Sequence, residues 1–430
     1  MYPRLTSLAH RVVGKFYFRR VACAVFLALA SSASPVWAGV MAGVPKDLVE
    51  SGMPSFVVLG PESLGLSRAP TDLGILPDGR LVAVSKQEIA FGDGVRWQTF
   101  QSRNDNSGVI IDRIAVGDDG QIFTGVAGKI ARVAFGIDGR WSLEPAVDLP
   151  ANVGVSTAVL TRVSKLTDGW YWYSRSGGIF SWKVGQRPKI VGKLGAIEGV
   201  FSVGKDTFAS NSAMGELYRI DPEGTNDVVR VSPPTALAGD CITCTVPFGP
   251  GVVLTGTINA GVQLFDGATS RPFKAGRLLG PGHRISDLCA ITDSLFAAAV
   301  DTIGIVFFDR DGRIVQVLDR GQDHRLSRVK LLRYAPNGVL WAVLDEGIAR
   351  VEFPSPVTHF EPLILSGVDY AKPIRFEGKL WLLCDGRMLQ GIYDDEGRLT
   401  GFNDHSPPGL ASVNSAIVEG SLWTTSDTGV

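Results

Sequence analysis

The feature that most constrains the fold of this chain is a repeated unit of about 40 residues. Each unit holds a short apolar stretch, a polar turn that usually contains glycine, and a second stretch of alternating character. The stretches are LVAVSKQEIAFGDG from Leu81, IFTGVAGKIARVAF from Ile122, WYWYSRSGGIFSWKVG from Trp170, TFASNSAMGELYRIDPEG from Thr207, VVLTGTINAGVQLFDG from Val252, LFAAAVDTIGIVFFDRDG from Leu295, LWAVLDEGIARVEF from Leu340, LWLLCDGRMLQGIYDDEG from Leu380 and LWTTSDTGV from Leu422. Gly261, Gly304 and Gly347 are equally spaced, and Gly429 continues the series. The chain is therefore built from copies of one small motif.

Tight turns in front of these stretches indicate antiparallel hairpins. A strand and a turn precede them in DLGILPDGR, RIAVGDDGQ, VFSVGKDT, LCAITDS, LLRYAPNG, PIRFEGK and AIVEG. Asp-Gly and Asn-Gly turns join antiparallel strands because glycine accepts the positive φ that the hairpin needs. A further hairpin follows several units, at DPEG, DRDG and DDEG. Each unit is therefore expected to hold four antiparallel strands.

Four-stranded units at this period predict an all-β fold, a β-propeller with about 40–43 residues per blade. One blade cannot bury both faces of its sheet, whereas blades stacked around an axis do so and leave few free edges. A leucine-rich solenoid would need a Leu and Asn ladder that is missing here, and immunoglobulin-like sandwiches would need a period near 100 residues. Trp341, Trp381 and Trp423 mark one strand of successive units and are expected to pack between blades as core.

Units of the form DG-x-LW-x-x-x-x-x-GI-x-R-V-E resemble the two-component regulator propeller repeats. PNGVLWAVLDEGIARVEFPSPVTHF is the best match, and the closing VNSAIVEGSLWTTSDTGV fits the same pattern. The resemblance covers nearly all of the chain after residue 38 and is strongest in the last four units. Earlier units depart from it, since LVAVSKQEIAF lacks the aromatic residue and DGWYWY is unusually rich in aromatic residues.

The resemblance implies a non-catalytic, extracytoplasmic sensor region that binds a small molecule or protein. Family members typically continue through a membrane helix into a histidine kinase, a diguanylate cyclase or a similar output domain, and a receptor of this kind can be a homodimer. An exported propeller enzyme of lyase or lactonase type and a protein-interaction scaffold are the alternatives. An enzyme should show converging acid, base or metal groups at the mouth of the channel.

We expect residues 39–430 to form the propeller repeats. Nine unit starts exceed one ring of seven blades, and single propellers usually have four to eight. The units are therefore expected to form one seven-bladed propeller plus the start of a second, or a truncated array, with a nine-bladed ring as the alternative. The last unit, SLWTTSDTGV, stops inside a hairpin. This ending suggests that the chain is the front part of a longer receptor.

Residues 1–38 have the order of a secretory signal peptide. MYPRLTSLAHRVVGKFYFRR carries five basic residues and no acidic residue, VACAVFLALA is apolar, and SSASPVWA offers Val36 and Ala38 around a cleavage point. The apolar run of about ten residues is shorter than the roughly 20 that span a bilayer. Cys23 stands at the start of that run, which does not suit a lipoprotein acceptor. We expect export to the periplasm, cleavage near Ala38 and no membrane span in this chain.

After removal of these residues the chain is mildly acidic. Nucleic-acid binding requires a basic surface, so we expect no nucleic-acid partner. The four remaining cysteines include Cys241 and Cys244 in the motif CITC. DCITCTV alternates like a strand, on which residues three apart point to opposite faces. We expect reduced, structural cysteines, with a local disulfide or redox or metal chemistry as alternatives.

Two histidine-arginine pairs are the candidate ligand-binding residues. HRIS begins at His283 and HRLS at His324, each just before the first strand of adjacent units. That connection crosses the propeller face where the central channel opens, so His283, Arg284, His324 and Arg325 are expected near one another. Together they could hold an anionic or polar ligand through charge-assisted hydrogen bonds. The alternative is that they are solvated loop residues copied with the repeat.

No catalytic, metal or cofactor site is expected from the sequence. The chain contains no GxSxG, HExxH or Walker motif. Zinc needs three or four converging ligands, which two histidines do not supply. DRDG at Asp309 and DDEG at Asp394 lack the ligand spacing of a calcium-binding EF-hand, so ordinary turn chemistry explains them.

Overall fold

The computed structural model describes residues 53–102, 110–126, 129–150, 160, 162–173, 178–211, 215–221, 228–231, 237, 239–355, 358–359, 371–384, 386–393, 399–407 and 415–424. The proposed signal peptide, the DDEG turn at Asp394 and Gly429 lie outside these ranges. The chain divides into two compact units, one spanning Gly52–Glu361 and the other holding the residues from Pro362 onward. In the described residues the regular structure is β-strand and short 3-10 helix. The fold class is the β-propeller of four-stranded blades that the repeat predicts.

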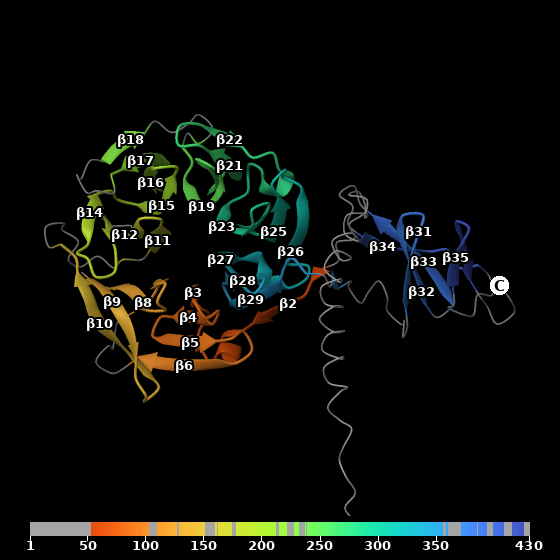
Figure 1. Ribbon diagram of the computed structural model, residues 1–430, viewed down its shortest axis with the longest axis horizontal. Helices are drawn as coiled ribbons and strands as arrows, with labels where there is room; N and C mark the ends of the chain where they lie inside the picture. The colour runs from red at the N-terminus through yellow and green to blue at the C-terminus, as the bar shows by residue number, and fades with distance from the viewer. Residues whose placement is uncertain are drawn as a thin grey trace, which may run out of the picture. The chain divides into compact units, whose positions relative to one another are not determined.

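In the first unit, groups of four antiparallel strands surround a central axis (Figure 1). The first two groups join into one eight-stranded sheet, because their outermost strands make a short parallel pairing. The first four groups are β3 (Asp72–Ile75), β4 (Leu81–Ser85), β5 (Glu88–Gly92) and β6 (Trp97–Ser102); β7 (Ile114–Val116), β8 (Ile122–Val126), β9 (Lys129–Phe135) and β10 (Arg140–Asp148); β11 (Arg162–Leu166), β12 (Gly169–Tyr173), β13 (Ile179–Trp182) and β14 (Lys189–Gly192); and β15 (Ile197–Val203), β16 (Asp206–Asn211), β17 (Glu216–Ile220) and β18 (Val228–Val231). The remaining groups are β19 (Ile242–Gly249), β20 (Val252–Thr257), β21 (Val262–Phe265) and β22 (Ser270–Pro272); β23 (Ile285–Thr292), β24 (Leu295–Val300), β25 (Gly304–Asp309) and β26 (Ile314–Asp319); and β27 (Val329–Ala335), β28 (Val339–Leu344) and β29 (Gly347–Glu352) with β2 (Phe56–Leu59). Shorter elements are β1 (Met53–Pro54), paired with β30 (Thr358–His359), and the 3-10 helices η1 (Pro61–Leu64), η5 (Arg277–Leu279) and η6 (His324–Ser327).

The repeated apolar stretches are the second strands of these sheets. Seven of the nine form β4, β8, β12, β16, β20, β24 and β28 of the first unit. All residues of β4, β8 and β28 are buried, on both faces of the sheet. Such strands read as continuous apolar runs because neighbouring sheets cover both of their faces.

The hydrophobic core lies between the sheets, in clusters that draw on two neighbouring blades each. One cluster joins Phe307 of β25 to Leu340 of β28, and another joins Trp341 of β28 to Leu81 of β4. A third joins Trp141 of β10 to Val84 of β4. Trp341 is 2 % exposed, as expected for a residue that packs between blades.

The N-terminal strand β2 completes the last sheet of the ring. It pairs antiparallel with β29, so the strand order of this sheet is β2-β29-β28-β27. The fourth strand of that sheet therefore comes from the beginning of the described chain. The repeat in the sequence did not reveal this closure.

The equally spaced glycines stand at or next to the start of third strands. Gly304 and Gly347 have φ of +140° and +150°, and Gly261 has φ of +71°. A Cβ on Gly304 would lie 2.2 Å from the Leu318 carbonyl oxygen, and one on Gly347 would lie 2.1 Å from that of Leu59. Any side chain would therefore strike the neighbouring strand, which explains the repeated glycine.

The second unit contains the same motif. Its strands are β31 (Lys372–Phe376), β32 (Lys379–Cys384), β33 (Arg387–Tyr393) and β34 (Leu399–Asp404) in one sheet, and β35 (Ser415–Val418) and β36 (Ser421–Thr424) in another. Trp381 of β32 is 6 % exposed, in agreement with a core role. Trp423 of β36 is 51 % exposed, so the core prediction is wrong for this residue. In the described part of the chain its sheet has only two strands, too few to cover an indole.

Candidate functional site

The strand order gives the propeller two different faces. Hairpins between first and second strands, and between third and fourth strands, lie on one side, which we call the hairpin face. Loops between second and third strands, and the connections from one blade to the next, lie on the other side, which we call the connector face. Both histidine-arginine pairs lie in blade connections, because His283 precedes β23 and His324 begins η6 in front of β27. The structure thus places them on the connector face.

A single loop lies beside both pairs. The loop runs from Asp301 to Ile303 between β24 and β25. The Asp301 backbone N–H donates to the Arg284 carbonyl oxygen at 2.9 Å, and the Thr302 N–H donates to that of Ser327 at 3.1 Å. The two connections therefore lie next to the same loop, linked through backbone hydrogen bonds.

The side chains of the two histidine-arginine pairs differ in their exposure and in the contacts that they already make. His283 is half-buried and Arg284 is exposed. The His324 side chain is 81 % exposed, with Nδ1 3.6 Å from Asp323 and Nε2 3.8 Å from Glu346. Both distances exceed that of a normal hydrogen bond. His324 and Arg284 are therefore accessible to a ligand from solvent.

Arg325 is held by its neighbour instead. Its Nη2 donates to Asp323 Oδ2 at 2.6 Å, its Nε donates to Oδ1 at 3.0 Å, and its backbone N–H donates to Oδ1 at 2.9 Å. This guanidinium lowers the pKa of the Asp323 carboxyl below its ordinary value. The pair caps η6 and fixes the connection. Ligand binding by Arg325 stays a prediction, as it does for the other three residues.

A set of acidic and basic residues on the innermost strands was not identified from the sequence. Asp72 of β3 accepts the backbone N–H groups of Leu73 and Ile114, each at 2.9 Å. Ile114 belongs to β7, so this carboxylate bonds the innermost strands of two neighbouring blades.

Asp287 of β23 repeats the arrangement between two other blades. It accepts the N–H of Leu288 at 3.0 Å and that of Leu332, on β27, at 2.8 Å. Arg333 Nη1 lies 3.4 Å from Asp287 Oδ2. A third link joins β11 to β15, where Arg162 contacts the Glu198 carboxylate at 2.6 Å and its carbonyl oxygen at 2.8 Å.

Asp72 and Asp287, which we call the inner acids, lie in an environment that favours their neutral form. Burial raises the pKa of Asp72 above 3.8, although Arg113, Arg333 and the two N–H groups act in the opposite direction. Burial also raises the pKa of Asp287, against the opposing effect of Arg333, and the charge of Asp72 adds to the rise. Arg333 therefore acts on both acids, which belong to the blades on either side of its own. A single carboxylate within an apolar strand, as in DLGIL and ISDLCAI, is the sequence signal for these residues.

The cysteines offer little nucleophilic or redox chemistry. No disulfide joins the cysteines at 241, 244, 289 and 384, all of which fall in described ranges. Burial raises the pKa of the Cys241 thiol to about 11, and it also raises the pKa of Cys244. A thiol with such a pKa is almost entirely protonated at neutral pH, and the thiolate is the reactive form.

Possible metal ligands and the DRDG turn are the remaining candidate features of the chain. Within the described ranges no group of three or more His, Cys, Asp or Glu side chains is placed to hold a metal ion. Asp309 Oδ1 accepts the backbone N–H groups of Asp311 and Arg313, so DRDG is a hydrogen-bonded turn. Among the described residues no helix has the length and hydropathy of a membrane span.

Comparison with known proteins identifies the fold but no family. No protein-family model matches the chain. No curated protein matches it in sequence.

Several solved structures share the fold at low sequence identity. PorZ, a surface component of the type-IX secretion system of Porphyromonas gingivalis, is 16 % identical with a TM-score of 0.54 over 79 % of this chain and 54 % of its own. The extracellular domain of BT4673 from B. thetaiotaomicron, described as a putative one-component system, is 13 % identical with a TM-score of 0.54 over 86 % and 51 %. Virginiamycin B lyase from Staphylococcus aureus is 11 % identical with a TM-score of 0.52 over 70 % and 99 %. The chain spans about half the length of the first two proteins.

Proposed function

We propose that this chain is the extracytoplasmic, ligand-binding propeller region of a signal-transduction receptor of the two-component regulator propeller type. In this role it binds a polar or anionic ligand on the connector face and passes a change in orientation to other parts of the receptor. It performs no catalysis itself.

One observation carries this proposal, namely how far the structural likeness extends along the chain. The lyase likeness covers 70 % of this chain and 99 % of the lyase, which corresponds to one ring. The likeness to the BT4673 extracellular domain covers 86 % and 88 % in two structures. Residues 1–361 make up only 84 % of the 430-residue chain, so these alignments continue into the second unit. The extent of this likeness supports a match to the sensor-type protein that goes beyond a single ring.

The connector face supplies the groups that suit a polar ligand. Arg284 and His324 are exposed on connections that share one loop, and His283 lies beside Arg284. Arginine binds carboxylates and phosphates through paired hydrogen bonds, and protonated histidine adds a second positive charge. Asp323 holds Arg325 in place, so we assign Arg325 the role of fixing the connection.

A thermal-shift screen of the purified full chain tests the ligand site. The probes are phosphate, citrate, galacturonate and neutral hexoses, applied to the wild-type chain and to an Arg284→Gln/His324→Gln double variant. At least one anionic probe is expected to raise the Tm of the wild type and not that of the double variant. Arg320→Gln serves as the matched control, since it removes an arginine that the proposed site does not use.

Recovery of the probe decides between binding and catalysis. A receptor region returns the ligand unchanged after long incubation, as measured by NMR. Conversion of the probe would contradict the receptor role and favour the enzyme. A Tm shift that persists in the double variant, or no shift with any probe, would remove the connector face as the site.

Export is part of the same proposal and has its own test. We expect the mature chain to begin at Gly39, after the small residues of SSASPVWA. Mass spectrometry of the protein from a Gram-negative periplasm should find this N-terminus. Recovery of the uncleaved chain from the cytoplasm would contradict export.

The enzyme alternative rests on the inner acids. Asp72 and Asp287 have raised pKa values, a property that proton-transferring carboxyl groups often share. Their hydrogen bonds to backbone N–H groups of neighbouring blades favour a structural role instead. The NMR experiment distinguishes an enzyme from a receptor region, because only an enzyme converts its ligand.

A further inference from the structure

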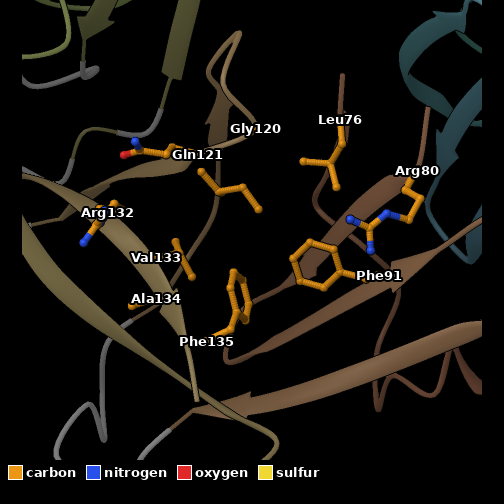
Figure 2. A pocket seen from close by; sticks show the side chains of 10 residues that line it. Leu76, Arg80, Phe91, Gly120, Gln121, Arg132, Val133, Ala134 and Phe135 are labelled. Carbon is orange, nitrogen blue, oxygen red and sulfur yellow. The ribbon is translucent and has the colours of Figure 1, made fainter. Parts of the chain in front are cut away.

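A pocket of about 390 Å³ opens between the first two blades. It lies among β5, β8 and β9 and the hairpins that follow β3 and precede β8, which belong to the hairpin face. Leu76, Phe91, Val133 and Phe135 give it apolar walls, and Arg80 and Gln121 add polar groups (Figure 2). Its volume lies within the about 300–1,000 Å³ of small-molecule sites. The pocket is on the opposite face from the histidine-arginine pairs.

Aromatic rings form the centre of this pocket. The rings of Phe91 and Phe135 meet edge to face at 4.8 Å and 86° (Figure 2). Phe100 packs against both, at 5.7 Å from Phe91 and 5.1 Å from Phe135. Phe135 nevertheless remains 37 % exposed. Such rings favour a further aromatic ring in an edge-to-face or offset arrangement.

Arg80 places a positive charge beside these rings. Its guanidinium points toward Phe91 (Figure 2). Nε donates to Asp78 Oδ2 at 2.7 Å, and the described residues provide no hydrogen-bond partner for the two Nη groups. Arg80 and Asp78 are 60 % and 51 % exposed, so solvent screens this ion pair strongly. The ion pair therefore leaves the Nη groups able to bind a second carboxylate.

The other arginine of the pocket is held through two of its three guanidinium nitrogens. Arg132 directs both Nε and Nη2 to Oε2 of Glu144. It thus lines the same pocket with its Nη2 already bound, whereas neither Nη group of Arg80 has a partner among the described residues. This difference provides a matched control.

We propose that the pocket between the first two blades binds a small aromatic carboxylate. The ring lies against Phe91 and Phe135, and the carboxylate accepts hydrogen bonds from the Nη groups of Arg80. The site is separate from the connector face, so the failure of one proposal leaves the other in place.

Titrations of the full chain by saturation-transfer NMR test the proposal with three probes. trans-Cinnamate carries both the ring and the charge, cinnamamide carries only the ring, and hexanoate carries only the charge. The wild type is expected to bind cinnamate at least about tenfold more tightly than the other two, because a hydrogen bond to a charged group contributes at least that much. Arg80→Gln is expected to reduce cinnamate affinity to that of cinnamamide, and Phe135→Ala is expected to weaken both aromatic probes.

The controls are Arg132→Gln, which changes the other arginine of the pocket, and Ile137→Ala, which removes a fully exposed side chain outside it. Both are expected to bind cinnamate as the wild type does. The proposal is overturned if the three probes bind equally or not at all, or if Arg80→Gln and Phe135→Ala retain wild-type affinity. Equal losses in Arg132→Gln and Arg80→Gln would also overturn the assignment to Arg80.

Discussion

Leu59 of β2 lies opposite Ile348 of β29 in the antiparallel ladder that closes the ring. The two residues come from opposite ends of the first unit and belong to one hydrophobic cluster with Trp341 and Leu81. The preceding residue of β2, Val58, packs against the cluster on the other side of the same sheet. The closing strand is thus held by backbone pairing and by side chains on both of its faces.

This arrangement predicts that a charge at Val58 of β2 opens the ring. Val58→Asp is expected to lower the free energy of unfolding by about 3 kcal/mol, because a carboxylate would replace a half-buried apolar group that packs against the core. Val57 is 43 % exposed, so Val57→Asp should change the free energy of unfolding by less than about 0.5 kcal/mol. Urea denaturation of both variants measures the difference. Equal stability of the two variants would show that β2 is not needed for the closed ring.

The sequence predicted the blades well and their closure not at all. Every repeated apolar stretch is a second strand, because burial on both faces leaves a continuous apolar run, as in LVAVS and LFAAAV. β2 has the sequence FVVL, which lacks the turn and partner strand that mark the other units. Its pairing partner is distant in the chain, and periodicity reports only local repeats. The stretch PSPVTHFEPLILSGVDY after Phe353, which breaks the pattern of the repeat, was the available signal.

The repeated glycines make a second prediction. Gly304→Ala is expected to destabilise the first unit by more than about 3 kcal/mol, since the new Cβ would lie 2.2 Å from a carbonyl oxygen of β26. Gly139 also has positive φ, but a Cβ there would meet no atom within 4 Å. Gly139→Ala should therefore cost only about 1 kcal/mol, the conformational part of the effect. Thermal and urea unfolding measure both. A similar loss in the two variants would mean that backbone conformation alone explains the repeat.

The candidate site was predicted in position but not in its internal contacts. His283 and His324 both lie on the connector face because the repeat gave them equivalent places. The pairing of Arg325 with Asp323 follows from the local turn at the start of η6, which the repeat does not encode. Asp72 and Asp287 were missed because their importance depends on contacts between blades. Those contacts require the three-dimensional register of neighbouring inner strands.

The inner acids predict an unusual dependence of stability on pH. The pKa of Asp72 is raised in the folded chain, so the folded state holds this proton more tightly than the unfolded state does. Its contribution to stability is then complete below about pH 4 and is lost as the pH rises through the raised pKa. Between pH 4 and 7 the wild type should lose stability relative to Asp72→Asn, which cannot titrate. Urea denaturation across this range measures the difference.

Asp78 serves as the control of opposite sign. Hydrogen bonds from Arg80 lower its pKa, so its contribution is present above about pH 4 and is lost as the pH falls further. The difference between wild type and Asp78→Asn should therefore stay constant from pH 4 to 7. A constant difference for Asp72→Asn as well would show that burial does not govern the inner acid.

The cysteines give the last prediction, on reactivity. Burial raises the pKa of Cys241 to about 11 from an ordinary value of 9.0, which reduces the thiolate fraction at pH 8 by about 100-fold. Cys289 is shifted to about 11 for the same reason. Native protein should react with Ellman's reagent at least about 100-fold more slowly than protein unfolded in guanidinium, which exposes every thiol. The Tm should not change with dithiothreitol, because the structure holds Cys241 and Cys244 as thiols. Rapid labelling of the native chain, or a Tm that falls on reduction, would instead favour a redox-active or disulfide-bonded CITC motif.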